Sequence, residues 1–565
     1  MKRITAIVLA LVMAFGAAVC TTSAEEAKKG PTGGTITACI ASEPESIDPS
    51  IINSVDGSAY THHQFENLMK YAAIDELATE DPNMYLTEVA CGQADHYEVS
   101  EDLCTYTFYL RDDIYWSDGQ PVKAQDWVYS WQRLVNPDTA SDYGYFLDNV
   151  VLNAYEIYEE GSKAPSELGI KAIDDKTLEI TLEAPCAYFL EMCAFASLMP
   201  LRQDVVEGSD NWTDPANIVV NGPYKVTEWV HDSYIKMEPN EYYYDYENLG
   251  PECIIWYLSD NQTAIISAYQ SGEYDFIEDF PNDMIESLVA SGDCFVPSYV
   301  GTYYLYLNCD KITDWRVRAA MALSIDRENV VKNVTQAGEV PATGFVAAGI
   351  LDSTGKDFSK GVSELGALYN TLQGMYPDYD LSDYDGRCEL AMALYQAAVD
   401  EGAWDPNTTL VYNFNTSDSH KAIAEACGQD WSAVLGMNIT TQNQEWATYT
   451  NGLGEHTFGV ARLGWIADYN DPVTYLELMV TGNSNNYGLF SNTEYDAMIS
   501  QAKATQAGTE RDEILYKAEE VLFGEGGFPV APLYYYTNKY CMKNVSNAYY
   551  TTMGYFFFMY AKKTA

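Results

Sequence analysis

The sequence predicts a large protein of mixed strands and helices, either α+β or α/β, with more than one folding unit. The chain has 565 residues, which exceeds one typical domain, and 47% of them are hydrophobic, which allows sizeable cores. Segments with strand-like alternation are interleaved with segments of helix-like spacing. We find no internal repeat of about 20–50 residues that would indicate a solenoid or propeller.

Three segments have strand character. Residues 105–110 and 177–182 alternate apolar and polar side chains, so each is expected to bury one face. Residues 35–40 form a third such run, and a Pro-punctuated loop follows at 43–49.

Two segments have the spacing of amphipathic helices. Trp127, Trp131 and Leu134 recur at helical intervals, as do Val317, Met321 and Ile325. For the second helix we expect Asp314 to be the N-cap.

The first residues are typical of an export signal. Lys2 and Arg3 precede an apolar run from residue 4 to residue 19, shorter than the ~20 residues that a membrane-spanning helix needs. Cleavage after Ala24 would release a soluble protein. Cleavage before Cys20 would give a lipid-anchored one, and we favour this alternative because residues 17–20 (AAVC) resemble a lipobox, although Val19 departs from its usual small residue.

The charge balance is strongly acidic, with 83 acidic and 31 basic residues and a net charge of −52. Such a field repels phosphate backbones, so nucleic acid is excluded as an expected partner. A solvated acidic surface is the simplest interpretation, and it says little about the charge of a ligand.

The 12 cysteines include Cys20, and the odd number of others predicts at least one free thiol or an intermolecular bond. Their spacing contains no zinc motif. Cys91 with Cys104, and Cys186 with Cys193, are possible pairs in an exported protein.

Motifs for catalysis are absent from the sequence. It contains no HExxH, GxSxG, Walker A or GxGxxG motif. His62 and His63 lie near Glu66, but adjacent histidines cannot share one helix face, so we predict structural roles rather than metal binding. We therefore expect no metal, no cofactor and no enzymatic activity.

Residues 461–472 (ARLGWIADYNDP) combine a glycine, a tryptophan and an acid in largely apolar surroundings. A carboxylate there is costly unless it is paired, so Asp468 could await a cationic ligand group. The alternative is purely structural: a turn at Gly464 and Trp465, followed by Asp468 as a helix cap. For the tyrosine clusters at 302–306 and 534–536, core packing is the simpler interpretation, and a second face could line a cleft.

Several stretches, in order along the chain, resemble the oligopeptide-binding proteins of bacterial ABC importers, the family 5 solute-binding proteins. They are 115–134 (YWSDGQPVKAQDWVYSWQRL), 220–225 (VNGPYK), 303–308 (YYLYLN), 314–320 (DWRVRAA), 415–420 (NTSDSH), 443–446 (NQEW) and 462–472 (RLGWIADYNDP).

The resemblance implies an α/β fold like that of the type II periplasmic binding proteins, with two lobes that close on a central cleft. After the export signal (1–24) and a linker (25–34), lobe I comprises 35–62, 202–300 and 535–565. An extra subdomain, 63–201, is inserted into it, and 301–534 form lobe II.

The resemblance also implies ligand-binding roles for ten residues. Asp468 would pair with the amine of a peptide, close to Tyr143, and Gly464, Trp465 and Ile466 would run beside its backbone. Arg462 and His420 would receive its carboxylate, and Asn53, Ser54 and Val55 would line the cleft.

Three departures from the family pattern affect specificity. Gly301 and Ile466 stand where well-known members have a cleft disulfide, Leu453 replaces a carboxylate-binding arginine, and Asn53 replaces a cleft acid.

The sequence thus predicts a monomeric, extracytoplasmic receptor that captures oligopeptides and passes them to a membrane permease. Alternatives are the same fold with another ligand (a dipeptide, a signalling or cell-wall peptide, a nickel complex or a sugar), a surface adhesin or signalling receptor without transport, or a secreted hydrolase, for which no catalytic dyad is visible.

Overall fold

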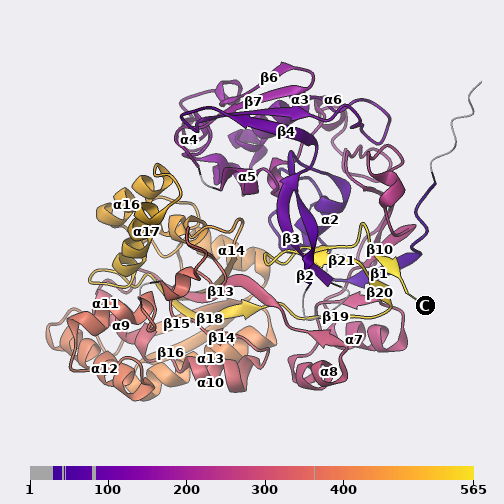
Figure 1. Ribbon diagram of the computed structural model, residues 1–565. Helices are drawn as coiled ribbons and strands as arrows, with labels where there is room; N and C mark the ends of the chain where they lie inside the picture. Colours follow the sequence, from indigo (N-terminus) through magenta and orange to yellow (C-terminus); the bar gives the residue numbers. More distant parts are fainter. Residues whose placement is uncertain are drawn as a thin grey trace, which may run out of the picture.

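Two large sheets form the framework of the computed structural model, and each is the base of one lobe (Figure 1). The structure describes residues 29–40, 43–44, 46–78, 84–186, 188–361 and 363–564. The predicted export signal, Cys20 and residues 25–28 of the predicted linker lie outside the described residues. The mixture of parallel and antiparallel strands with many helices confirms the predicted α/β class.

Lobe I is built on a sheet whose strands come from separated parts of the chain. β1 pairs in parallel with β10 and β11, and β8, β9 and β10 form an antiparallel meander. The seven strands, in spatial order, are β12 (Cys294–Phe295), β19 (Tyr540–Met542), β11 (Phe276–Ile277), β1 (Thr35–Cys39), β10 (Cys253–Tyr257), β9 (Tyr234–Pro239) and β8 (Tyr224–Val230).

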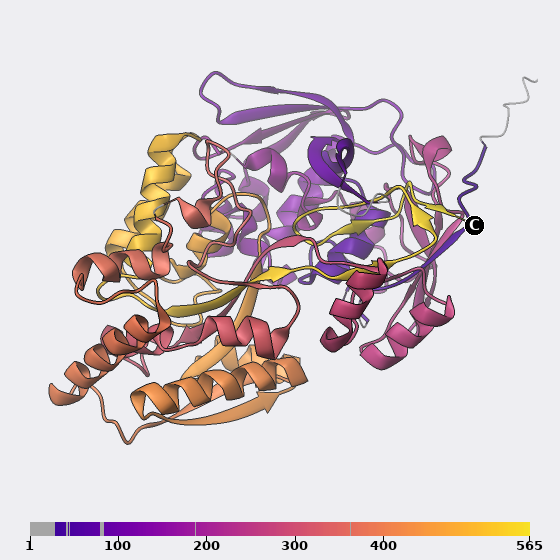
Figure 2. The ribbon, with the colours of Figure 1, turned by 60° about the horizontal axis from the view of Figure 1, so that its bottom comes forward.

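Lobe II is built on a six-stranded sheet flanked by helices, among them α9 (Trp315–Leu323), α12 (Tyr384–Asp400) and α13 (Asp418–Leu435) (Figure 2). Its strands, in spatial order, are β14 (Val340–Pro341), β18 (Val530–Thr537), β13 (Ser298–Leu307), β17 (Val460–Ile466), β15 (Thr409–Asn415) and β16 (Asn438–Gln444). Asp314 caps α9 as predicted, and its carboxylate accepts a hydrogen bond from the backbone N–H of Arg316 at 2.8 Å.

Two four-stranded sheets accompany lobe I. One contains the two strands predicted by alternation and lies at the top of Figure 1: β4 (Ala94–Val99), β5 (Thr105–Leu110), β7 (Thr177–Thr181) and β6 (Ile170–Asp174). The other joins an early hairpin to the C-terminal segment: β2 (Met69–Ala78), β3 (Met84–Cys91), β21 (Ala548–Tyr550) and β22 (Phe556–Phe557). The boundaries between lobe I and its inserted subdomain stay predictions.

The chain crosses between the lobes twice, and the two crossings run side by side. It enters lobe II between β12 and β13, at residues 295–298, and returns between β18 and β19, at residues 537–540. β13 and β18 are antiparallel partners, and Ser298 pairs with Thr537 beside the crossing points. Two adjacent strands shared in this way can serve as a hinge.

Residues 115–134 are organised around three buried tryptophans. Trp116, Trp127 and Trp131 are all fully buried, and each indole N–H has a partner: Asp126, Asn67 and the Leu198 carbonyl, at 3.0, 2.9 and 2.9 Å. Asp126 also accepts from the backbone N–H of Lys123 at 2.9 Å at the start of α3 (Ala124–Leu134), the predicted first helix. The motif thus caps its own helix and fixes its tryptophans.

His62 and His63 have structural roles within α2 (Val55–Gln64), as predicted. The rings contact the carbonyls of Ser58 and Ala59 at 2.7 and 2.8 Å, and the backbone N–H of Phe558 donates to His63 Nε2 at 3.0 Å. Burial lowers the pKa of both histidines to about 4. No group of three or more potential metal ligands occurs among the described residues.

All eleven cysteines in the described part of the chain are free thiols in the structure, so neither pairing suggested by sequence proximity is formed. In the part of the chain that the structure describes, every helix is too short or too polar to cross a bilayer.

The contact between β13 and β17 generates a stability prediction. Gly301 lies opposite Ile466, and a Cβ on Gly301 would come within 2.5 Å of Ile466 Cδ1 and 2.7 Å of a Tyr536 ring carbon. We expect Gly301→Ala to lower the free energy of unfolding by about 1–3 kcal/mol because of overpacking, and Ile466→Ala to recover part of this loss in the double variant.

Gly374→Ala is the matched control, because no atom lies within 4 Å of its Cβ position in helix α11 (Ala367–Met375). Denaturant unfolding should show this variant unchanged or up to about 1 kcal/mol more stable. Equal effects of the two alanines would contradict the proposed crowding at Gly301.

Candidate ligand-binding site

β17 presents an open edge where the sequence predicts contact with a peptide backbone. β13 pairs with it over its whole length, from Leu307 opposite Val460 to Gly301 opposite Ile466. On the other side, β15 pairs only with Val460 and Ala461. Residues 462–466 therefore have no strand partner on that side among the described residues, and 463–466 are half-exposed. An open edge of this kind can accept an extended peptide as an added strand.

Asp468 lies just beyond the end of β17 and is buried, with 7% of its surface exposed. Its Oδ1 accepts a hydrogen bond from the Tyr143 hydroxyl at 3.1 Å, and its backbone N–H donates to Thr474 Oγ1 at 3.2 Å. It forms no ion pair with any described lysine or arginine. Burial, together with the nearby charge of Glu477, raises its pKa to about 8 despite the Tyr143 hydrogen bond.

Asp471, three residues further on, is a carboxylate of the same segment that does have a cationic partner. Arg511 donates to both of its oxygens at 2.7 and 2.8 Å, and the backbone N–H of Val473 donates to Oδ1 at 3.0 Å at the start of α15 (Val473–Leu476). The structural alternative for Asp468 is therefore wrong on both counts: Gly464 and Trp465 lie within β17, and the N-cap of the following helix is Pro472.

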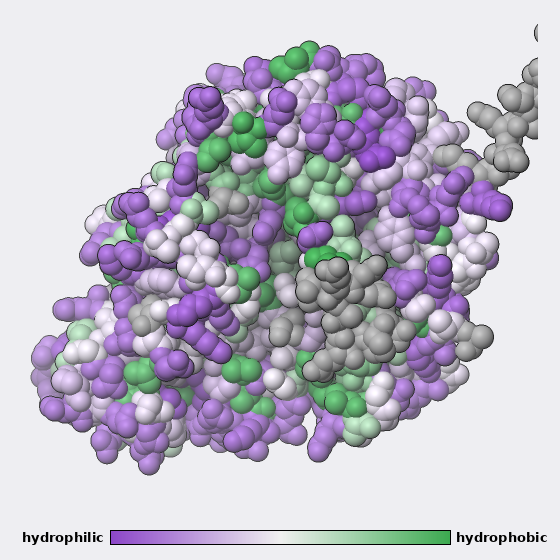
Figure 3. Space-filling model, viewed as in Figure 1, coloured by the Kyte–Doolittle hydropathy of each residue, from purple (hydrophilic) through white to green (hydrophobic). Residues whose placement is uncertain are grey.

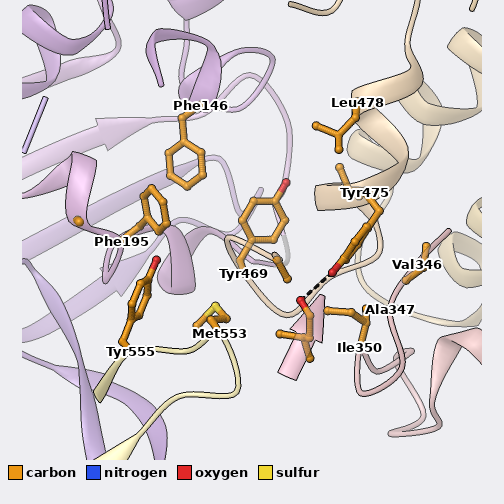
Figure 4. Packing of buried hydrophobic residues seen from close by; sticks show 14 of the residues in the cluster. Phe146, Phe195, Val346, Ala347, Ile350, Tyr469, Tyr475, Leu478, Met553 and Tyr555 are labelled. Carbon is orange, nitrogen blue, oxygen red and sulfur yellow. Dashed lines mark hydrogen bonds between the residues drawn. The ribbon is translucent and has the colours of Figure 1, made fainter. Parts of the chain in front are cut away.

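Aromatic side chains from both lobes meet in the core between them (Figure 4). Phe146, Phe195 and Tyr555 approach from lobe I and its neighbouring subdomain, and Tyr469 and Tyr475 approach from lobe II. Four further tyrosines have pKa values that are raised by burial and also by the negative charge of Asp468: Tyr71, Tyr145, Tyr475 and Tyr555. The sequence did not single out any of the four. The general abundance of tyrosine was the only sequence signal for this ring of hydroxyl groups.

Arg462 and His420 come together at the other end of the open edge. Arg462 is buried, donates to Asn415 Oδ1 at 2.8 Å and lies 5.0 Å from the Tyr303 ring centroid, but no carboxylate pairs with it among the described residues. His420 Nδ1 is 3.4 Å from the Tyr303 hydroxyl. Burial, and then the charge of Arg462, lowers the pKa of His420 to about 2. This end is therefore cationic and lacks an anion.

Asn53, Ser54 and Val55, which were predicted to line the cleft, lie at the start of α2. Ser54 is its N-cap and accepts from the Gly57 N–H at 3.3 Å, and Val55 is the first helical residue. Asn53 is exposed and donates to Asp142 Oδ2 at 2.8 Å, next to Tyr143. Asn53 thus connects the helix to the segment that reaches Asp468.

The lobes are closed on one another in this structure. The backbone N–H of Asn470 donates to Glu191 Oε2 at 2.7 Å, and the rings of Tyr188 and Tyr469 stack with their centroids 4.3 Å apart. Lys503 also reaches across to the Asp148 carbonyl at 3.3 Å. Figure 3 shows hydrophobic side chains in the recess between the upper body and the lower-left one.

A separate cavity of about 350 Å³ lies beside α2 and β2 in lobe I. Its lining includes His62, Glu66, Lys70 and Tyr71, but neither Asp468 nor Arg462. It is therefore distinct from the interlobe site.

The fold and this site define a two-lobed binding protein that encloses its ligand between hinged halves. More narrowly, the chain belongs to the bacterial extracellular solute-binding proteins of family 5, whose family model matches residues 88–487. The chain is 32% identical over 510 residues to the periplasmic oligopeptide-binding protein OppA of Salmonella typhimurium, with 89% of this chain and 87% of that protein covered.

Two solved structures place the lobes relative to those of known proteins. Haemophilus influenzae OppA in complex with the peptide RPPGFSPFR matches with a TM-score of 0.80 at 27% identity, covering 95% of this chain and all of that one. The murein tripeptide-binding protein MppA in its unliganded open form matches with a TM-score of 0.65 at 29% identity, covering 93% and 97%. The lobe arrangement is thus closer to the peptide-bound form.

The raised pKa of Asp468 generates a pH prediction. With a pKa of about 8, the unliganded carboxyl group is largely protonated at pH 6–7, whereas a cationic partner favours its ionised form. Binding of an ammonium group at pH 6–7 should therefore release close to one proton. Affinity should rise up to tenfold per pH unit towards pH 8, where a peptide amine begins to lose its own proton.

Calorimetry in buffers of different ionisation enthalpy measures this proton release. Asp468→Asn should abolish it. A binding enthalpy that is the same in all buffers for the unmodified protein would contradict the prediction.

Proposed function

We propose that this protein binds oligopeptides between its lobes, holding the peptide amine at Asp468, and delivers them to a membrane permease. The observation that supports the proposal most directly is that Asp468 is buried, has no cationic partner among the described residues and accepts a hydrogen bond from the Tyr143 hydroxyl. An ammonium group would supply the missing charge and the hydrogen-bond donors. The names of the relatives support a peptide as the source of this group.

The spacing along β17 supports an extended ligand with two charged ends. Arg462 and Asp468 are six residues apart on an extended chain, which corresponds to roughly 20 Å. A peptide lying along the open edge at 464–466 would place its amine at Asp468 and its carboxylate near Arg462 and His420. Ligands of up to about six residues fit this span.

Backbone recognition would make the site tolerant of sequence. Hydrogen bonds to the edge of β17 do not depend on side-chain identity, and bridging waters can satisfy varied side chains at little cost. Asn53, Ser54, Val55 and Tyr143 would close the cleft from the lobe I side.

We further infer that the chain acts as a monomer, is anchored through an acylated Cys20 and performs no chemistry on its ligand. The lipobox-like residues 17–20 support the anchor, and the absence of catalytic motifs from the sequence supports the last statement. Placement outside the cytoplasm follows from the family.

The amine anchor is tested by Asp468→Ala. We expect a loss of about 2–5 kcal/mol of binding free energy for a free-amine peptide, which is the scale for truncating one member of a buried charge pair. N-acetylation of the peptide should cost a similar amount with the unmodified protein and little with the variant. Unchanged calorimetric affinity of the variant for the free-amine peptide would overturn the assignment.

The carboxylate end is tested by Arg462→Met, which keeps the length of the side chain and removes its charge. We expect a loss of about 1.5–3 kcal/mol for a short free-acid peptide and a much smaller loss for its C-terminal amide. Arg316→Met is the control, because Arg316 lies on α9, away from the site, and pairs with Asp314 at the start of that helix and with Glu401 at the end of α12. If amide and acid lose equally, Arg462 does not bind the carboxylate.

A further inference from the structure

Two cysteines lie directly opposite one another at the edge of the lobe I sheet. Cys294 in β12 is the register partner of Cys541 in β19, and Phe295 pairs with Tyr540 beside them. Both cysteines are buried, with 2% and 0% of their surfaces exposed. They are 247 residues apart in sequence, so the fold alone brings them together.

The geometry of this pair suits a covalent bond. Directly opposed residues in an antiparallel pair have Cα atoms about 4.5–5.5 Å apart, which is within the range of about 4.4–6.8 Å that disulfides span. Opposed side chains also point to the same face of the sheet. Both are free thiols in this structure, and each lies close enough to shift the pKa of the other.

The position of the pair in the chain gives the bond a structural consequence. Cys294 precedes the first crossing into lobe II, and Cys541 follows the return crossing. All six strands of the lobe II sheet lie between them in sequence. A bond here would close lobe II into one covalent loop and join the bases of the two crossing strands.

We propose that Cys294 and Cys541 form a disulfide in the exported protein, which clasps the lobe I ends of the two crossing strands. The two thiols lose two protons and two electrons as the sulfur–sulfur bond forms. An external disulfide oxidant, either a small molecule such as oxidised glutathione or the disulfide of an oxidase outside the cytoplasm, is reduced to two thiols in exchange.

The surroundings of the pair favour Cys294 as the attacking group. The hydrogen bond with Cys541, and then the positive charge of Lys539, lower the pKa of Cys294. Cys39 lies in the same row of the sheet but is separated from Cys541 by Ile277. Burial, together with the acidic charges of Asp279 and Glu278, raises the pKa of Cys39 to about 12, which makes it a poor competitor.

The test is a peptide map of the full-length protein purified after export, alkylated in denaturant without reduction and compared with a reduced sample. We expect a cross-linked pair of peptides containing Cys294 and Cys541, two alkylated cysteines fewer than in the reduced protein, and two regained after reduction. Protease cuts within 301–534 should leave the flanking fragments joined on a non-reducing gel.

Cys39→Ala is the matched control and should retain the cross-link, whereas Cys541→Ala should lose it. If Cys541→Ala does not fold, the unmodified protein still tests the proposal. Reduction should lower its melting temperature, and re-oxidation with oxidised glutathione should restore that temperature. Full alkylation of Cys294 and Cys541 after export and after glutathione oxidation would overturn the proposal, as would a Cys39–Cys541 cross-link.

Discussion

The burial of Asp468 without a cationic partner is the constraint on which the site depends. A carboxylate at such a position costs several kcal/mol if it is ionised alone, and the unliganded protein avoids that cost by keeping it protonated. Both lobes contribute to the burial of Asp468, because the Tyr143 hydroxyl and the Asp468 carboxylate come from opposite sides of the cleft. The electrostatic site therefore exists fully only when the lobes are closed. A cationic ligand end would stabilise both the ionised acid and the closed arrangement, which couples binding to closure.

The open edge of β17 complements the Asp468 carboxylate, because it can form hydrogen bonds with the backbone that all peptides have in common. β15 leaves β17 after Ala461, so the same strand that is anchored in the sheet at one end offers free backbone groups nearer Asp468. Arg462 stands where the pairing stops and Asp468 lies beyond the opposite end. One strand and its extension thus place a cation, a stretch of backbone and an acid in line. None of these three groups contacts the side chains of the proposed peptide. Selectivity would then depend on the distance between the charged ends more than on sequence.

The sequence predicted what depends on local pattern, and it missed what depends on tertiary contact. Alternation located β5 and β7, helical spacing located α3, and the 462–472 motif pointed to Asp468. The choice between binding and capping at Asp468 needed the structure, because only the fold shows that Arg511 neutralises Asp471 and leaves Asp468 alone. The tyrosines around Asp468 come from segments as distant as Tyr71 and Tyr555, and no spacing rule connects them. For the same reason, spacing along the chain did not locate the opposed cysteines: Cys91 and Cys104 form no bond in the structure, while Cys294 and Cys541, which lie opposite one another, are 247 residues apart.

The departure at Gly301 and Ile466 is explained by packing. These positions are register partners, so cysteines in relatives could bridge β13 and β17 there, whereas here the Ile466 side chain fills the space above Gly301. This chain therefore holds β13 and β17 together by hydrogen bonds and apolar contact, within the lobe that must move. A clasp at Cys294 and Cys541 would lie at the lobe I ends of the crossing strands instead. A covalent link at that point can reinforce the base of the hinge without restraining β17, the strand whose free edge we propose receives the peptide.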